Sequence, residues 1–183
     1  MKTFTILIGL LSLLPISSLA ATITGTYSAG NIPTNHLSYS ATCNGPVTPL
    51  AITLPAGGPY NVTSVDVVYD MTAAGGAWMS EQRSQIYCQN TTTSEGTYYS
   101  GAGTTGGTFS YSRAGLGIAN GAYAGGTTLT FEMWAYRTWG TAPTCGTGYN
   151  QVDNGTWQIT VTYVAATPMA YSSSTCTQAN TST

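Results

Sequence analysis

The chain has 183 residues, of which four are Lys or Arg and six are Asp or Glu, so its net charge is −2 and only 5% of it is charged. So few cations disfavour nucleic acid and anionic membrane surfaces as partners, because both are bound through clustered Lys and Arg. Hydrophobic residues make up 42% of the chain, with 13 Tyr and 4 Trp, which excludes a disordered polymer and favours a folded domain.

The first twenty residues have the pattern of a secretory signal peptide. Lys2 supplies a positive charge, the apolar run from Phe4 to Leu14 is too short to cross a membrane, and Ala20 ends a small-x-small sequence. We therefore expect cleavage before Ala21 and a secreted protein with no membrane insertion. Loss of Lys2 would leave three arginines against six carboxylates, a net charge of −3.

Beyond the signal peptide, apolar and polar residues alternate in short segments separated by Gly, Pro, Asn and Ser, which is typical of strands and turns. The predicted strands are Thr22–Tyr27, His36–Ala41, Leu50–Leu54, Val62–Met71, Met79–Tyr87, Thr108–Arg113, Thr128–Trp139 and Thr156–Tyr163. About eight strands without helices predict an all-β fold, an antiparallel β-sandwich of jelly-roll type over residues 21–164, followed by a polar tail at 165–183.

Alternation within the longer strands predicts which side chains face the core. The residues expected inside are Val65, Val67, Tyr69 and Met71 on one strand, Trp157, Ile159, Val161 and Tyr163 on another, and Leu129, Phe131, Met133, Ala135, Arg137 and Trp139 on the long strand. A guanidinium on an apolar face needs a carboxylate or carbonyl partner, because an unpaired buried charge is very costly.

The cysteines predict two disulfide bonds, since all four lie after the signal peptide of an exported chain. Of the three pairings that four cysteines allow, we favour Cys88 with Cys145, and Cys43 with Cys176, which would tie the two ends of the domain together. Zinc is disfavoured because no Cys-x-x-Cys sequence is present.

The catalytic motifs in the sequence are weak, and we predict that the protein is not an enzyme. The Gly-rich segment 101–106 matches G-x-G-x-x-G but leads into a strand, not a helix. His36 is the only histidine, and no G-x-S-x-G sequence accompanies it. Asp66 and Asp70 lie about 13 Å apart along one strand, farther than the ~5–9.5 Å of glycosidase carboxylates. A hydrolase pairing Glu132 with Asp66 across strands is the less favoured alternative.

The segment AWMSEQRSQIYC, residues 77–88, places two of the few charges side by side. Alternation puts Glu81 and Arg83 on the same face, near the strand that carries Arg137. We predict a structural ion network in which Glu81 neutralises Arg83 or Arg137. Glu81→Ala should then lower the melting temperature more than Arg113→Ala does.

The non-core face of the long strand carries the predicted binding site. Trp134 and Tyr136 lie there beside Glu132, and Tyr98 and Tyr99 are expected in a neighbouring loop. Exposed aromatic rings stack on sugars or fill protein interfaces, so we predict a binding or adhesion module for a glycan or a cell-surface protein. The alternative is a structural subunit of an extracellular fibre or coat, because so weakly charged a surface favours self-association.

A metal site is a secondary prediction. Asp153 begins the sequence Asp153-Asn154-Gly155, which favours a tight turn before the last strand. The alternative is a calcium site in which Asp153 and Asp70 supply oxygen ligands. No other cofactor is expected.

Four segments carry a family resemblance: NVTSVDVVYDMTA, AWMSEQRSQIYC, TFEMWAYRTWG and YNQVDNGTWQITVTY. Together they resemble secreted jelly-roll modules of bacterial surface proteins. The closing VDNGTWQITVTY is also similar to the end of the P domain of subtilisin-like proprotein convertases, onto which Asp153, Gly155 and Trp157 map. The resemblance spans Val62–Tyr163 and implies an accessory or binding module, with calcium sites in the case of the P domain.

Overall fold

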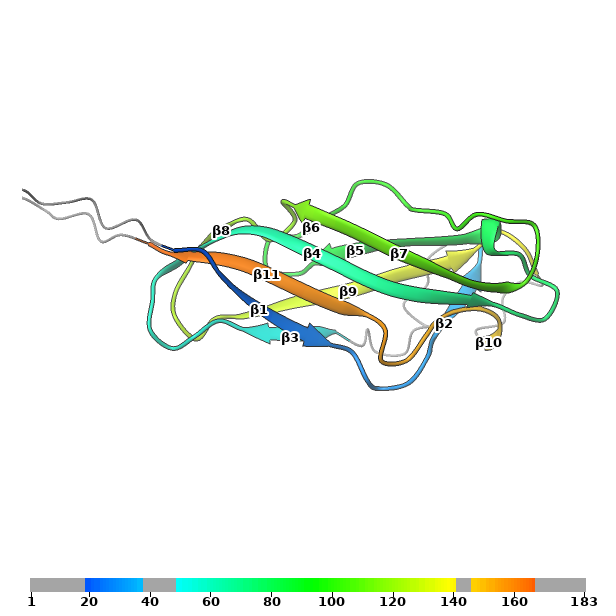
Figure 1. Ribbon diagram of the computed structural model, residues 1–183, viewed down its shortest axis with the longest axis horizontal. Helices are drawn as coiled ribbons and strands as arrows, with labels where there is room; N and C mark the ends of the chain where they lie inside the picture. The colour runs from blue at the N-terminus through cyan, green and yellow to red at the C-terminus, as the bar shows by residue number, and fades with distance from the viewer. Residues whose placement is uncertain (1–18, 38–48, 141–145, 167–183) are drawn as a thin grey trace, which may run out of the picture.

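The computed structural model describes residues 19–37, 49–140 and 146–166, and this part of the chain is all-β apart from one 3-10 turn (Figure 1). No helix in these ranges is long and apolar enough to cross a membrane. The elements are β1 (Ala21–Thr26), β2 (Ile32–His36), β3 (Leu50–Thr53), β4 (Tyr60–Ala73), η1 (Met79–Glu81), β5 (Gln82–Cys88), β6 (Thr93–Ser94), β7 (Gly107–Leu116), β8 (Gly121–Tyr123), β9 (Thr128–Arg137), β10 (Gly146–Val152) and β11 (Gln158–Ala165).

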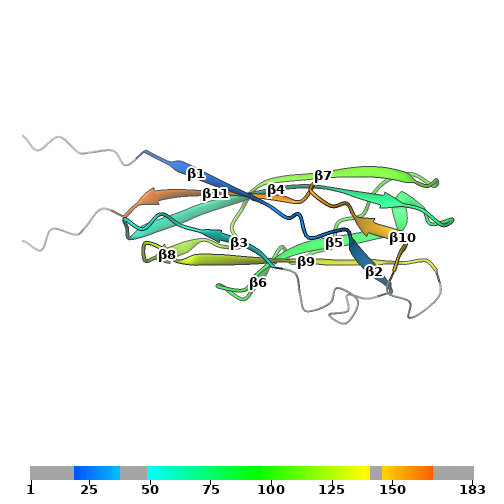
Figure 2. The same ribbon diagram turned by 90° about the horizontal axis from the view of Figure 1, so that it is seen from below.

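The strands form two layers that pack face to face (Figure 2). In the first sheet β4 pairs with β11 and β10 along one side and with β7 and β8 along the other, and β1 pairs with β11. In the second sheet β9 pairs with β5 on one side and with β2 and β3 on the other, and β6 extends β5. Strand β2 joins the layers, because it pairs with β10 as well as with β9.

The all-β prediction is confirmed, and the structure adds details that the sequence pattern lacked. The pairing of β2 with β9 is parallel, so the strands are not all antiparallel as expected. Strands β2, β6, β8 and β10 were not predicted. The strand predicted at 36–41 shares only His36 with β2, which ends there, and Leu37 lies outside the strand. Residues 38–41 lie outside the described residues. The predicted strand at 79–87 begins at Gln82, since η1 occupies its first three positions.

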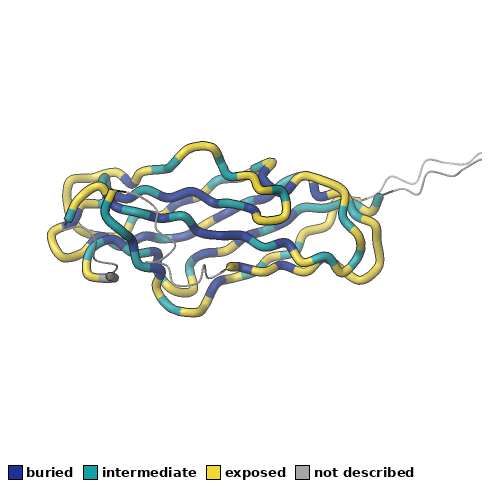
Figure 3. Tube along the Cα trace, turned by 180° about the vertical axis from the view of Figure 1, so that it is seen from behind, coloured by how far each residue is buried: buried dark blue, intermediate teal, exposed yellow. Residues whose placement is uncertain are grey.

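The predicted core alternation is confirmed along β4, β9 and β11. Buried residues lie along the strands between the layers, whereas exposed residues concentrate in the turns (Figure 3). The predicted inward residues are buried except two: Tyr163 is half-buried against the core, and Trp139, which follows the end of β9, is exposed. Burial of this apolar surface at about 25 cal/mol per Å² is the main stabilising term of the fold.

The disulfide prediction is not decided by the structure. Cys88 is buried at the end of β5, opposite Phe131 of β9, and forms no disulfide within the described ranges. Its predicted partner Cys145, and the predicted pair Cys43 and Cys176, lie outside the described residues. The polar tail lies outside them from residue 167 on.

The predicted ion network of Glu81 is wrong. Glu81 belongs to η1, and its Oε2 accepts a hydrogen bond from the Trp78 backbone N–H at 2.7 Å, so the carboxylate caps the turn. Arg83 lies opposite Tyr136 and Arg137 opposite Gln82, so the two arginines point to opposite faces of the second sheet. In the described residues no ion pair joins Glu81 to either arginine.

Both arginines are held by backbone carbonyls instead. Arg83 donates to the carbonyls of Ser80 and Gln82 at 2.8 and 2.7 Å. Arg137 is fully buried and donates to the Thr34 carbonyl. A buried guanidinium therefore has the polar partner that its position on an apolar face requires.

The ion pair that does join the layers is Arg113 with Glu95. Arg113 Nε and Nη2 donate to the two Glu95 oxygens at 2.6 and 2.8 Å, and Nη1 donates to the Tyr69 hydroxyl at 3.0 Å. The Tyr69 hydroxyl also shares a hydrogen bond with Ser84 at 2.7 Å. Glu95 accepts the Ile86 backbone N–H in addition. This network, which we call the Arg113 clamp, links β4 and β7 of the first sheet to β5 of the second.

Candidate functional site

The outer face of the second sheet carries a row of aromatic rings, which we call the outer strip: Tyr87, Trp134, Tyr136 and Tyr98. Tyr87 stacks on Trp134 with centroids 4.6 Å apart, and Tyr98 meets Tyr136 edge to face at 4.9 Å. The rings gather here because β5 and β9 are neighbours and their outward residues alternate on one surface. The sequence alternation placed Trp134 and Tyr136 on this outer face, and the structure brings the predicted loop residue Tyr98 against Tyr136.

Glu132 orients the rings of the outer strip. Its side chain is only 8% exposed, and its carboxylate accepts hydrogen bonds from Trp134 Nε1 at 2.7 Å and from Gln89. Burial raises the pKa of the Tyr98 hydroxyl, which is hydrogen-bonded to Gln85. The ring faces and polar atoms of this strip are therefore largely engaged with one another.

Tyr99 does not belong to the outer strip, which corrects one predicted binding residue. Its backbone N–H and carbonyl bond to Ser84, so residues 98 and 99 extend the edge of β5 and point to opposite sides. The Tyr99 ring lies 4.5 Å from the Arg113 guanidinium. Tyr99 is thus part of the Arg113 clamp.

The predicted turn at Asp153 is confirmed. The Thr156 N–H donates to the Asp153 carbonyl, and Gly155 has a φ of +76° that favours glycine. The Asp153 carboxylate accepts from Thr72 Oγ1 at 2.7 Å and from Gln151. Within the described ranges no group of three or more His, Cys, Asp or Glu side chains is placed to hold a metal ion.

The carboxylates considered for hydrolysis do not converge. Glu132 faces outward from the second sheet, whereas Asp66 sits between the buried residues Val65 and Val67 and so faces outward from the first. Asp66 accepts the Gly115 backbone N–H at 2.8 Å. These two carboxylates therefore lie on opposite sides of the sandwich.

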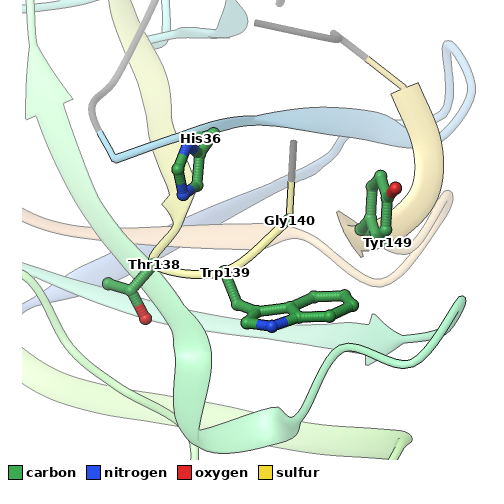
Figure 4. Close-up of a pocket in the computed structure, with 5 residues that line it drawn as sticks. All are labelled: His36, Thr138, Trp139, Gly140 and Tyr149. Carbon is green, nitrogen blue, oxygen red and sulfur yellow. The ribbon is translucent and has the colours of Figure 1, made fainter. Parts of the chain in front are cut away.

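A second aromatic site, which the sequence analysis missed, lies where β2, β9 and β10 meet at one end of the sandwich. It is a hollow of about 290 Å³, which we call the end hollow, lined by His36, Thr138, Trp139, Gly140 and Tyr149 (Figure 4). The residue Trp139 is 43% exposed, one of the most exposed aromatic residues in the described chain. A single exposed ring is ordinary, but a contiguous exposed apolar surface often marks a ligand site, and Trp139 lies beside Tyr149.

The rings of the end hollow are fixed in place. Trp139 meets Tyr149 edge to face with centroids 5.7 Å apart, and the buried Arg137 guanidinium lies 4.6 Å from the Tyr149 ring centroid. A Cβ on Gly76 would lie 3.3 Å from the Trp139 ring, so glycine lets the indole pack closely against this loop. The φ of +89° at Gly76 independently favours glycine. A preformed aromatic wall reduces the entropy lost on binding.

Polar atoms near the end hollow have unused hydrogen-bonding capacity. His36 Nδ1 is buried and has no partner in the described residues. Next to Tyr149, the Asn150 amide is buried with neither of its side-chain atoms bonded in those ranges. Buried polar groups are normally paired, so these two side chains are exceptions at this end of the fold.

Comparison with known proteins identifies no family. The chain matches no protein-family model and no curated protein. Among solved structures it is similar to infectious bursal disease virus, Gx strain, with a TM-score of 0.36 and 14% identity over 88% of this chain and 42% of that one. It is similar to the VP2 subviral particle of that virus at a TM-score of 0.38 and 16% identity, over 87% and 43%.

A third structure in that comparison is the GH26-CBM35 β-(1,4)-mannanase of Podospora anserina. Its TM-score is 0.36 with 11% identity, over 81% of this chain and 29% of that one. The chain thus spans less than half the length of each of these proteins. At TM-scores below 0.5 these likenesses carry no argument about function.

Proposed function

We propose that this protein is a secreted, non-enzymatic binding module with a jelly-roll-like sandwich, and that it binds a carbohydrate whose sugar ring occupies the end hollow. The observation that carries the proposal is the exposed Trp139 indole, which forms one wall of a hollow with Tyr149 and His36 beside it. An exposed indole face stacks on the apolar face of a sugar ring. Export rests on the signal-peptide pattern of the first twenty residues.

The composition of the end hollow favours a small neutral ligand. Ligand sites combine aromatic walls with a few polar groups, and 290 Å³ lies at the lower limit of their usual size. The lining residues Tyr149, Thr138 and His36 supply the polar side chains of the end hollow. The nearest cation, Arg137, is already bonded to Thr34. The outer strip, with Trp134 and Tyr136, is the alternative surface for a glycan or a cell-surface protein.

The test is a glycan array followed by calorimetry on the glycan that binds. Trp139→Ala should weaken binding ~10-fold, since a stacked ring contributes about 0.5–1.5 kcal/mol beyond its buried area and 1.4 kcal/mol is tenfold. Trp134→Ala is the matched control in the outer strip and should leave the affinity unchanged.

The opposite result, with affinity lost in Trp134→Ala and kept in Trp139→Ala, would move the site to the outer strip. Binding that survives both substitutions would reject both surfaces. No cofactor enters the proposal, so a chelator should not change the affinity. Loss of binding on chelation would instead support the calcium hypothesis for Asp153.

A further inference from the structure

We propose that β1 is an interaction edge for a second copy of this chain, with the two β1 strands pairing antiparallel about a twofold axis. Strand β1 lies at one edge of the first sheet. It pairs with β11 from Ala21 opposite Tyr163 to Thr26 opposite Gln158, and its other edge has no strand partner in the described residues. An open edge offers unpaired N–H and C=O groups to another strand.

The other edges of the sandwich are protected. On the far side of the first sheet β8 has only three residues, whereas β7 pairs regularly with β4 from Gly107 to Arg113. Strand β7 carries the inward-pointing charge of Arg113, and a register shift and the Gly115 φ of +72° interrupt it after that residue. In the second sheet the outer edge of β5 is paired with the two residues of β6 and, at Ser84, with Tyr99. Strand β3 has four residues, and β2 contains Pro33. Short strands, irregular register and proline are the usual devices against edge pairing.

Strand β1 has none of these devices. Its sequence, ATITGT, contains no charged residue and no proline, and all six residues pair with β11 without a register shift. Charged side chains, lysine above all, are the commonest protection of an exposed edge. Strand β1 is therefore an edge of this fold that is regular along its whole length and carries no charge.

The sequence of β1 is compatible with pairing to itself. A twofold axis at Thr24 sets each Thr24 opposite its copy and each Thr22 opposite Thr26 of the other chain. The same chemistry already exists inside the sheet, where the hydroxyls of Thr24 and Thr160 lie 2.8 Å apart across β1 and β11. Cross-strand Thr pairs are favourable, and no like charges face each other along the strand. The dimer would join two sheets into one continuous sheet.

The inference does not depend on carbohydrate binding, since β1 contributes no residue to the end hollow. Failure of either proposal is therefore visible separately. A Trp139→Ala variant that no longer binds glycan should still dimerise.

The experiment is sedimentation velocity of the purified chain over a wide range of concentrations. The wild type should shift from monomer to dimer as concentration rises, and Thr24→Lys should remain monomeric, because two ammonium groups would face each other at the axis. Ser112→Lys is the matched control: it makes the same type of change at an exposed residue of β7 and should dimerise like the wild type. A monomeric wild type at every concentration, or a dimer that persists in Thr24→Lys, would overturn the proposal.

Cross-linking keeps the test valid if Thr24→Lys fails to fold. Thr24→Cys should give a covalent dimer under mild oxidation, with the linkage between the two residues 24 established by mass mapping, whereas Ser112→Cys should not. A wild type that dimerises only after removal of residues 167–183 would show that this segment of the same chain covers β1. That result would reject the second copy as the native occupant.

Discussion

The two ends of the sandwich core differ in chemistry. Toward β3 and β8 the core is apolar, with residues such as Leu129, Phe131 and Val161 all fully buried. Toward η1 the layers are joined by hydrogen bonds: Tyr111 donates to Gln82, which donates to the Met71 carbonyl, beside the Arg113 clamp. The candidate binding site lies at the second end.

This difference shows how the fold combines stability with a preorganised site. Apolar packing is strong but not directional, whereas a satisfied polar network fixes side chains in one arrangement. The polar end holds Arg137 against Tyr149, and Tyr149 in turn supports Trp139. We infer that the apolar end provides most of the folding free energy and that the polar end determines the geometry of the end hollow.

The largest expected effect is at the apolar end. Phe131→Ala should lower the free energy of unfolding by about 3–5 kcal/mol, because it removes a fully buried ring and leaves a cavity. Val68→Ala, at a residue of β4 that is 42% exposed, is the control and should change it by less than about 0.5 kcal/mol. Urea unfolding measures both. A loss of under 1 kcal/mol in Phe131→Ala would contradict this account of the core.

The next largest effect is expected when the ion pair at the polar end is removed. Arg113→Ala should lower the free energy of unfolding by about 3 kcal/mol, because Glu95 is left buried without its cation. Glu81→Ala should cost only about 1 kcal/mol, the value of a lost cap. The sequence pattern predicts the opposite, a larger loss of stability in Glu81→Ala than in Arg113→Ala. Urea unfolding of the two variants decides between these two orders. A double variant, Arg113→Ala with Glu95→Gln, isolates the interaction energy of the Arg113–Glu95 ion pair.

Much of the fold follows from the sequence because period-2 alternation directly reports burial in half-buried strands. Val65, Val67 and Phe131 were identified as core residues for this reason. The pattern failed for strands that are short or that change layers. Strand β2 contains Pro33 and bridges both sheets, and β10 is rich in Gly and polar residues, so neither shows regular alternation.

The candidate site was less predictable because it depends on contacts distant in sequence. The outer strip was found from the alternation around Trp134. The end hollow joins His36 to Trp139 and Tyr149, three residues that no local motif connects. The one available signal was Gly140, which ends the β9 pattern and places Trp139 beyond the strand. The partner of Arg113 was missed because Glu95 lies in an irregular segment with no periodicity.

A further expected effect, smaller than those of Phe131→Ala and Arg113→Ala, is the pH dependence of the polar end. Burial raises the pKa of the Tyr69 hydroxyl from 10.0 to about 12, despite the opposing effect of Arg113, and burial also raises the pKa of Tyr111. The folded state therefore keeps the neutral phenol where the unfolded chain already ionises. Stability from Tyr69 is complete below pH ~10 and is lost between about pH 10 and 12, by about 2–3 kcal/mol in total.

Tyr69→Phe tests this assignment. The variant should be about 1–3 kcal/mol less stable at neutral pH, since Ser84 and Arg113 each lose a hydrogen bond. Its free energy of unfolding should then fall less steeply than that of the wild type above pH ~10, with the remaining slope due to Tyr111 and other tyrosines. Parallel curves for the two proteins in urea titrations at alkaline pH would show that Tyr69 ionises equally easily in both states. The polar end would then be more accessible to water than its hydrogen bonds indicate.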